Sequence, residues 1–243
     1  SSKAFLKAVF GENPYGRPVE GTEESIDTIS RGDVVDFYKI HYAPNNTIMS
    51  VVGDISGDEL NALINKYFKD WQKKDVPTRT LPATGAAAGP RVVKINKEIT
   101  QANIILGHAG VSRDNPDFYA LTVMNYILGG GGFSSRLMEE IRNKRGLAYS
   151  VHSFFDPGKM PGSFQVGLQT KNVSAREAIS LVREGLKRIQ KEPVSEKEVE
   201  AARKYLIGSF PLRMDTQGKM VNFLLQMEYY GLGMDYPERY PRL

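Results

Sequence analysis

Apolar residues recur at helical spacing in several stretches of the chain, and turn-forming residues separate these stretches. Residues 1–10 carry one such stripe, which Gly11 ends. A second stripe runs from Leu60 to Phe68, and Ser56 and Glu59 precede it in the pattern of a capping box. The spacing predicts helices, and we expect two further ones behind capping boxes at Ser174 and Ser195 and another behind a similar pattern at Ser30. Two more are expected from Pro116 to about Leu128 and from about Thr216 to Tyr229.

Other apolar runs are short and bounded by turn residues, which is typical of strands. The expected strands are Thr47–Gly53, Val92–Ile95, Ala102–His108, Ala148–Phe154 and Ser163–Thr170. The last two are joined through Asp156-Pro-Gly, so we expect them to pair antiparallel. The order of elements predicts an α+β fold with helices packed on one face of a mostly antiparallel sheet.

A stretch of small residues without periodic apolar character occupies residues 78–90. Such composition is typical of a linker. We therefore expect one domain within residues 1–77 and a second within residues 91–243.

Composition narrows the classes of function. The chain has 243 residues, 41% of them hydrophobic, and a net charge of +4 from interspersed basic and acidic residues. This pattern predicts no nucleic-acid-binding surface, and no apolar run reaches the length of a membrane span. The absence of cysteine excludes disulfides, thiol nucleophiles and cysteine-ligated zinc.

Four consecutive glycines, Gly129, Gly130, Gly131 and Gly132, follow a predicted helix rather than a strand. A phosphate-binding P-loop would also need a lysine, which is absent here. The glycines fit the end of one helix, followed by an N-cap at Ser134 or Ser135 for the next. An alternative interpretation is that they form a mobile hinge or a backbone segment that contacts peptide.

Arg145 and Tyr149 follow the glycine run at spacing i, i+4. Two such residues lie on the same side of a strand and also of a helix. They would offer a guanidinium and a phenolic hydroxyl to one ligand. A structural alternative has Arg145 paired with Glu139 or Glu140 and Tyr149 packed at a sheet edge.

No metal or nucleophile motif is present in the sequence. The three histidines, His41, His108 and His152, lack the spacing of a zinc signature. No Gly-x-Ser-x-Gly elbow occurs, so the sequence predicts no serine-based triad. We expect no catalytic residue and no metal ligand in this chain.

Three segments together resemble the pitrilysin/insulinase-type zinc peptidases, in the branch of mitochondrial processing peptidase and its bacterial relatives. Residues 13–26 are similar to the loop that follows the family's zinc-binding region. Residues 42–54 are similar to the last strand of its first domain, and Gly129–Tyr149 resembles the most recognisable part of its second domain.

The resemblance implies two similar α+β domains of the inverzincin type that enclose a chamber. Residues 1–77 would be the rear of an incomplete first, zinc-peptidase-type domain, and residues 91–243 a second, zinc-free domain truncated at its C-terminus. Both ends of the sequence look like cuts through a longer protein. The compartment stays open, with a soluble protein of the bacterial cytoplasm or periplasm favoured over a mitochondrial one.

No residue here matches the family's His-x-x-Glu-His motif or its downstream Glu ligand, so the resemblance implies that zinc is held by the rest of the parent protein or by a partner. A homodimer or a heterodimer with a zinc-bearing subunit would complete the enzyme, and this chain alone is expected to be inactive. In that assembly zinc-assisted hydrolysis would cleave a peptide held by Arg145 and Tyr149. The alternative is a catalytically inactive structural or partner subunit of the same fold.

Overall fold

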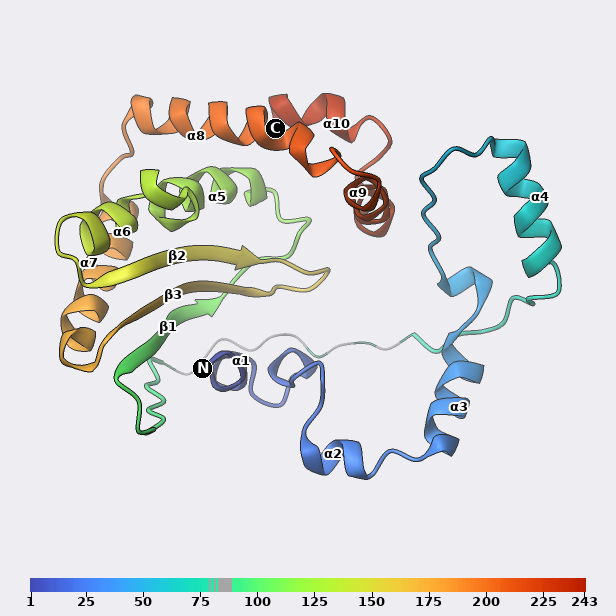
Figure 1. Cartoon of the computed structure of the whole chain (residues 1–243), viewed down its shortest axis with the longest axis horizontal. Coiled ribbons are helices and arrows are strands. Elements are labelled where there is room, and N and C mark those ends of the chain that lie inside the picture. Colours follow the sequence, from blue (N-terminus) through green and yellow to red (C-terminus); the bar gives the residue numbers. More distant parts are fainter. Residues whose placement is uncertain (79, 81, 83–88) are drawn as a thin grey trace. The chain divides into compact units, whose positions relative to one another are not determined.

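A computed structural model describes residues 1–78, 80, 82 and 89–243 of the chain (Figure 1). The chain divides into two compact units, each made of two stretches of sequence: Ser1–Val19 with Leu81–Ile207, and Glu20–Thr80 with Gly208–Leu243. The predicted linker at residues 78–90 lies for the most part outside the described residues. The sequence-based domain limits therefore stay a prediction.

The first unit contains the sheet and the helices that cover it. Its strands are β1 (Gln101–Ala109), β2 (Ala148–Asp156) and β3 (Ser163–Lys171). Its helices are α1 (Ser2–Phe10), α5 (Phe118–Asn125), α6 (Arg136–Met138), α7 (Ala175–Lys191) and most of α8 (Glu196–Ser209), and two π-helical turns, Tyr126–Gly130 and Glu139–Asn143, continue α5 and α6.

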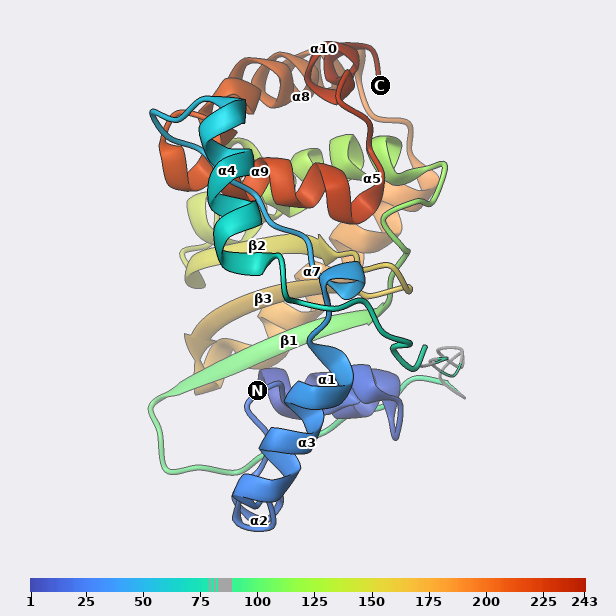
Figure 2. The same cartoon turned by 90° about the vertical axis from the view of Figure 1, so that its right-hand side faces the viewer.

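The three strands form one antiparallel sheet in the order β1-β3-β2 (Figure 2). Leu168 of β3 pairs with Ile104 of β1 on one side and with Val151 of β2 on the other. The register of β2 against β3 shifts between Ala148 and Val151. The predicted antiparallel pair of strands joined through Asp156-Pro-Gly is confirmed.

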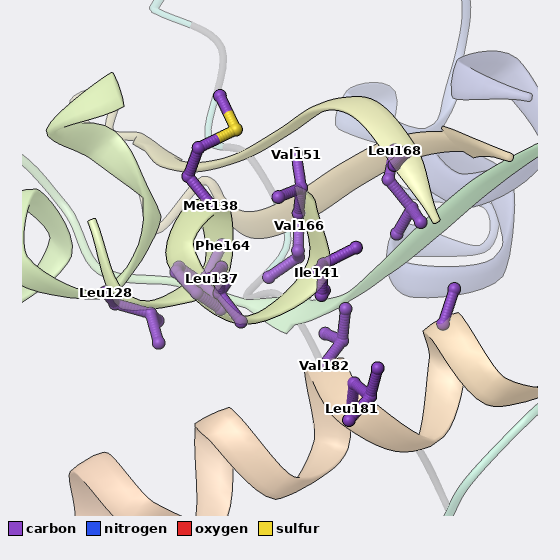
Figure 3. Packing of buried hydrophobic residues seen from close by; sticks show 12 residues of the cluster. Leu128, Leu137, Met138, Ile141, Val151, Phe164, Val166, Leu168, Leu181 and Val182 are labelled. Atoms are coloured by element: carbon purple, nitrogen blue, oxygen red, sulfur yellow. The ribbon is translucent and has the colours of Figure 1, made fainter. Parts of the chain in front are cut away.

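The hydrophobic core of this unit lies between the sheet and the segments around α6 and α7 (Figure 3). Ala178, Leu181 and Val182 of α7 are buried at helical spacing, so one stripe of that helix faces the sheet. Burial of each large apolar side chain contributes roughly 1.5–3 kcal/mol. The cluster consists of Leu128, Leu137, Met138, Ile141, Ala148, Val151, Phe164, Val166, Leu168, Ala178, Leu181 and Val182.

The second unit is helical in its described part. It contains α2 (Glu23–Asp27), α3 (Arg31–His41), α4 (Gly57–Phe68), α9 (Gln217–Tyr230) and α10 (Tyr236–Arg239). Aromatic rings hold its C-terminal stretch together, since the ring centroids of Phe210 and Tyr240 lie 4.0 Å apart and Phe223 and Tyr236 pack beside them. None of the helices formed by the described residues is both long and apolar enough to cross a membrane.

Most of the predicted helices exist. The capping boxes at Ser30, Ser56 and Ser195 form with all their hydrogen bonds. The capping box expected at Ser174 is wrong, because a 3-10 turn gives Ser174 helical torsion angles and its side chain makes no cap hydrogen bond. The helix expected to start at Pro116 begins two positions later, at Phe118.

Two predicted strands are wrong. Thr47–Gly53 and Val92–Ile95 adopt no regular secondary structure. A strand is defined by hydrogen bonds to a neighbour, and neither segment has a partner strand within the described parts of the chain. The expected apolar stripe of α4 is also largely exposed, with Tyr67 at 67%. The α+β class, with helices on an antiparallel sheet, is nevertheless confirmed.

Candidate functional site

Tyr149 is the second residue of β2 and is exposed over 85% of its surface. Its neighbour Ala148 faces the core and is 6% exposed. Side chains of a strand alternate between its two faces, so the core position of Ala148 directs Tyr149 away from the core. The phenol is therefore available to a ligand.

Arg145 lies in the turn before β2 and outside the strand. The prediction that Arg145 and Tyr149 share one side of a strand or a helix is therefore wrong. The reason is Gly146, whose φ of 60° places it in the left-handed region and reverses the chain there. Its N–H donates to the carbonyl of Arg142 at 2.9 Å, which ends the preceding helical segment.

The guanidinium of Arg145 is turned towards Glu140. It donates to the Glu140 carboxylate and, at 3.2 Å, to the Glu140 carbonyl. Hydrogen bonds from Arg145 and then from Lys144 lower the pKa of the Glu140 carboxyl. The pairing of Arg145 with Glu140 is the structural alternative considered from the sequence, and a role of Arg145 in binding substrate stays a prediction.

Arg142 is the arginine that contacts Tyr149, and the sequence reasoning missed it. Its guanidinium carbon lies 4.9 Å from the Tyr149 ring centroid and 4.5 Å from that of Phe133. Both distances are typical of a cation–π contact. The glycine at position 146 was the feature of the sequence that could have indicated this contact. It reverses the chain between Arg142 and Tyr149, which are seven positions apart.

The glycine run packs closely against β2. A Cβ atom on Gly129 would lie 2.5 Å from the Ser153 hydroxyl and 2.8 Å from the Ser153 backbone nitrogen, which no real side chain tolerates. Gly132 has a φ of 56° and opens the short 3-10 turn that carries Phe133. Gly130 and Gly131 lie between them, against Asn125 and Tyr126. The run thus sets the position of Phe133, whose ring is 68% exposed.

An ion pair joins α6, the short helix after the glycine run, to α8. Arg136 of α6 donates two hydrogen bonds, of 2.6 and 2.8 Å, to the two carboxylate oxygens of Glu198 at the start of α8. The hydrogen bond from Arg136, followed by those from Ser195, lowers the pKa of Glu198 to about 2. The sequence indicated only the capping role of Glu198, because residues 62 positions apart give no local pattern.

The histidines do not meet in a metal site. No group of three His, Cys, Asp or Glu side chains suited to a metal occurs among the described residues. The Nδ1 atom of His108 lies 2.7 Å from the Ala109 carbonyl oxygen, and the His152 ring stacks on Phe154. The side chains of the described chain therefore do not fit a zinc site.

Comparison with known proteins identifies the family. The family model described as "Peptidase M16 inactive domain" matches residues 28–206, which is more than half of the chain. The chain belongs to this family. The resemblance to pitrilysin/insulinase-type zinc peptidases is thereby confirmed. The matched part of the M16 inactive domain includes Phe133, Arg142 and Tyr149.

Relatives of this M16 domain bear two kinds of name. An uncharacterized zinc protease of Streptomyces coelicolor is 31% identical over 90% of this chain and 48% of its own length. A Helicobacter pylori protein named a non-peptidase homolog is 28% identical over 97% of this chain and 54% of its own length. The chain thus spans about half the length of these curated relatives.

A solved structure supports the same fold. The peptidase M16 inactive domain from Pseudomonas fluorescens is 30% identical, with a TM-score of 0.88, over 99% of this chain and 57% of that one.

Proposed function

We propose that this chain is the peptide-binding, zinc-free half of a zinc metalloendopeptidase that cleaves peptides inside a closed chamber. The zinc ligands and the general base would lie in the remainder of the parent protein or in a partner subunit of a homodimer or heterodimer. Relatives named zinc proteases, about twice as long as the chain, support this division of labour.

The observation that carries the proposal is the pair formed by Tyr149 and Arg142. Tyr149 is 85% exposed, and the Arg142 guanidinium lies against its ring. A phenolic hydroxyl and a guanidinium are strong donors to a peptide carbonyl. A donor placed where negative charge develops on that carbonyl would accelerate its hydrolysis.

Arg145 stays a further candidate for the same role. Its guanidinium donates to Glu140 in the free chain. It would therefore have to release Glu140 before it could bind a substrate carbonyl. Arg142 forms no ion pair with an acidic residue in the described part of the chain, so it needs no such release. We rank Arg142 ahead of Arg145 as the guanidinium that binds peptide beside Tyr149.

The proposal is tested by separating metal from peptide binding. The chain alone should bind no stoichiometric zinc and cleave no peptide, while the parent protein or the assembled pair should do both. Metal analysis and a peptide-cleavage assay measure this. About one zinc per chain, with cleavage that a chelator abolishes, would place the catalytic centre in this half and contradict the proposal.

A second candidate is a catalytically inactive structural or partner subunit. It is favoured by the Helicobacter pylori relative that is named a non-peptidase homolog. In that case substitutions of Tyr149 or Arg142 would leave the cleavage of any associated peptidase unchanged.

A further inference from the structure

A cavity of about 570 Å³ opens between α5, the C-terminal end of α7 and the first half of α8, all within the first unit. Figure 1 and Figure 2 both show α5 between the sheet and α8. Pockets that bind small molecules typically measure about 300–1,000 Å³. Phe133, Arg142 and Tyr149 do not line this cavity, so it is separate from the surface of the proposed peptide site.

The wall of the cavity is mainly apolar. Ile127 is 4% exposed, whereas Val123, Met124, Val194 and Val199 are only half-buried. An apolar ligand in the cavity would remove these half-buried side chains further from water, which favours binding. The wall is therefore suited to an alkyl chain.

The same cavity carries an excess of positive charge. Lys191, Glu192 and Arg203 are its charged lining residues within the described chain, and all three are exposed. Glu192 accepts a hydrogen bond of 3.2 Å from Arg188, which neutralises it. Lys191 and Arg203 form no ion pair or hydrogen bond with any side chain that the structure describes. Such side chains lay their methylene stems along apolar surface and keep their charges in water.

We propose that this cavity binds an amphipathic anion, namely an alkyl chain that ends in a carboxylate. The alkyl chain would lie against Val123, Met124 and Val199, and the carboxylate would meet Lys191 and Arg203. A neutral alkyl chain would leave both cations without a partner, and a small inorganic anion would leave the apolar wall in water. The site goes beyond the proposed peptide-binding function and does not depend on it.

The test is a titration with decanoate, followed by nuclear magnetic resonance of isotope-labelled methionine methyl groups. Met124 lines the cavity, and its signal is the one missing in Met124→Leu. Decanoate should shift this signal in a saturable way. Octanoate should bind roughly tenfold more weakly, because it lacks two methylenes. Decylammonium has the same alkyl chain with the opposite charge and should bind about threefold to tenfold more weakly than decanoate.

Variants assign the binding to the cavity. Lys191→Gln and Arg203→Gln should each weaken decanoate about twofold to fivefold, as expected for exposed charges. Ala120→Phe places a ring at the wall of the cavity and should block the alkyl chain. Ala120 is exposed, so this substitution leaves the core unchanged. Arg183→Gln removes an exposed arginine of α7 that does not line the cavity, and this matched control should change nothing.

The absence of a saturable shift at Met124 would overturn the proposal. Decylammonium that binds as tightly as decanoate would also overturn it and would identify the cavity as an apolar surface for another protein segment. Unchanged affinity in the variant that combines Lys191→Gln with Arg203→Gln would contradict the role of the two cations.

The same titration on the parent protein should give the same preference for decanoate. Loss of binding there would mean that the rest of the protein covers the cavity, which would contradict the proposal. Peptide cleavage by the parent protein is a separate measurement, so none of these results decides the proposed function.

Discussion

The guanidinium carbon of Arg142 lies 4.9 Å from the centroid of the Tyr149 ring. The two residues belong to different elements, Arg142 to the π-helical turn after α6 and Tyr149 to β2. The reversal at Gly146 brings them together on the surface of the first unit. This contact distinguishes Arg142 from Arg145, which is engaged by Glu140.

The first prediction compares these two arginines in the complete enzyme. Arg142→Gln should lower kcat/KM for peptide cleavage more than Arg145→Gln, because Arg145 must first leave Glu140. The ratio of the two effects, measured on the same peptide, decides between them. A larger loss of kcat/KM in Arg145→Gln would contradict this ranking and would support Arg145, the arginine indicated by the sequence, as the one that binds peptide.

The second prediction concerns the ion pair between Arg136 and Glu198. Glu198→Gln keeps the shape of the helix cap but removes the charge. It should lower the free energy of unfolding near neutral pH by about 1–2 kcal/mol. This is less than the full pKa shift would give, because one third of the Glu198 side chain is exposed and solvent screens the pair. Urea denaturation measures this loss. Glu200→Gln, at an exposed pair with Lys204, is the control and should have a much smaller effect.

The same ion pair predicts a dependence on pH. The pKa of Glu198 is lowered from 4.5 to about 2 in the folded chain. A lowered pKa means that the contribution is complete above the unfolded value and is lost as pH falls through the folded one. The difference in unfolding free energy between the wild type and Glu198→Gln should therefore shrink between pH 4.5 and about 2. A difference that stays constant over this range would contradict the role of the charge.

The third prediction concerns the close contact between the glycine run and β2. Gly129→Ala places a Cβ atom 2.5 Å from the Ser153 hydroxyl and should destabilise the fold by about 1–3 kcal/mol. Gly208→Ala in α8 has open space around it and should be neutral or stabilising by up to about 1 kcal/mol. Chemical denaturation of both variants compares them. If Gly129→Ala were as stable as Gly208→Ala, the run would be a hinge or loop rather than a packing element.

Local patterns in the sequence predicted the local structure well. The caps at Ser30, Ser56 and Ser195 are short-range hydrogen-bond motifs, and each formed as expected. The pair of β2 and β3 was predictable because one turn joins two apolar runs. The sequence indicated Tyr149 as a candidate side chain for a ligand, and the structure exposes it over 85% of its surface, while its role in binding stays a prediction.

Contacts between residues far apart in the sequence could not be predicted from such local patterns. The pair of Arg136 and Glu198 spans 62 positions and depends on how α6 meets α8. Arg142 was missed because the left-handed turn at Gly146, and not a regular strand, sets which arginine reaches Tyr149. The expected strand Thr47–Gly53 failed because apolar composition indicates a strand but supplies no partner for it.

The central claim is that the surface around Tyr149 binds peptide for a zinc site located elsewhere. The most direct test is Tyr149→Phe in the parent enzyme or assembled pair, with kcat/KM for a peptide and the melting temperature measured on one preparation. The account predicts that kcat/KM falls about tenfold to a thousandfold, since one donor to a developing oxyanion is worth about that much. The melting temperature should stay nearly the same, because the hydroxyl belongs to a side chain that is 85% exposed. Unchanged kcat/KM in Tyr149→Phe and in Arg142→Gln, with both variants folded, would contradict the account and assign the chain to a structural role.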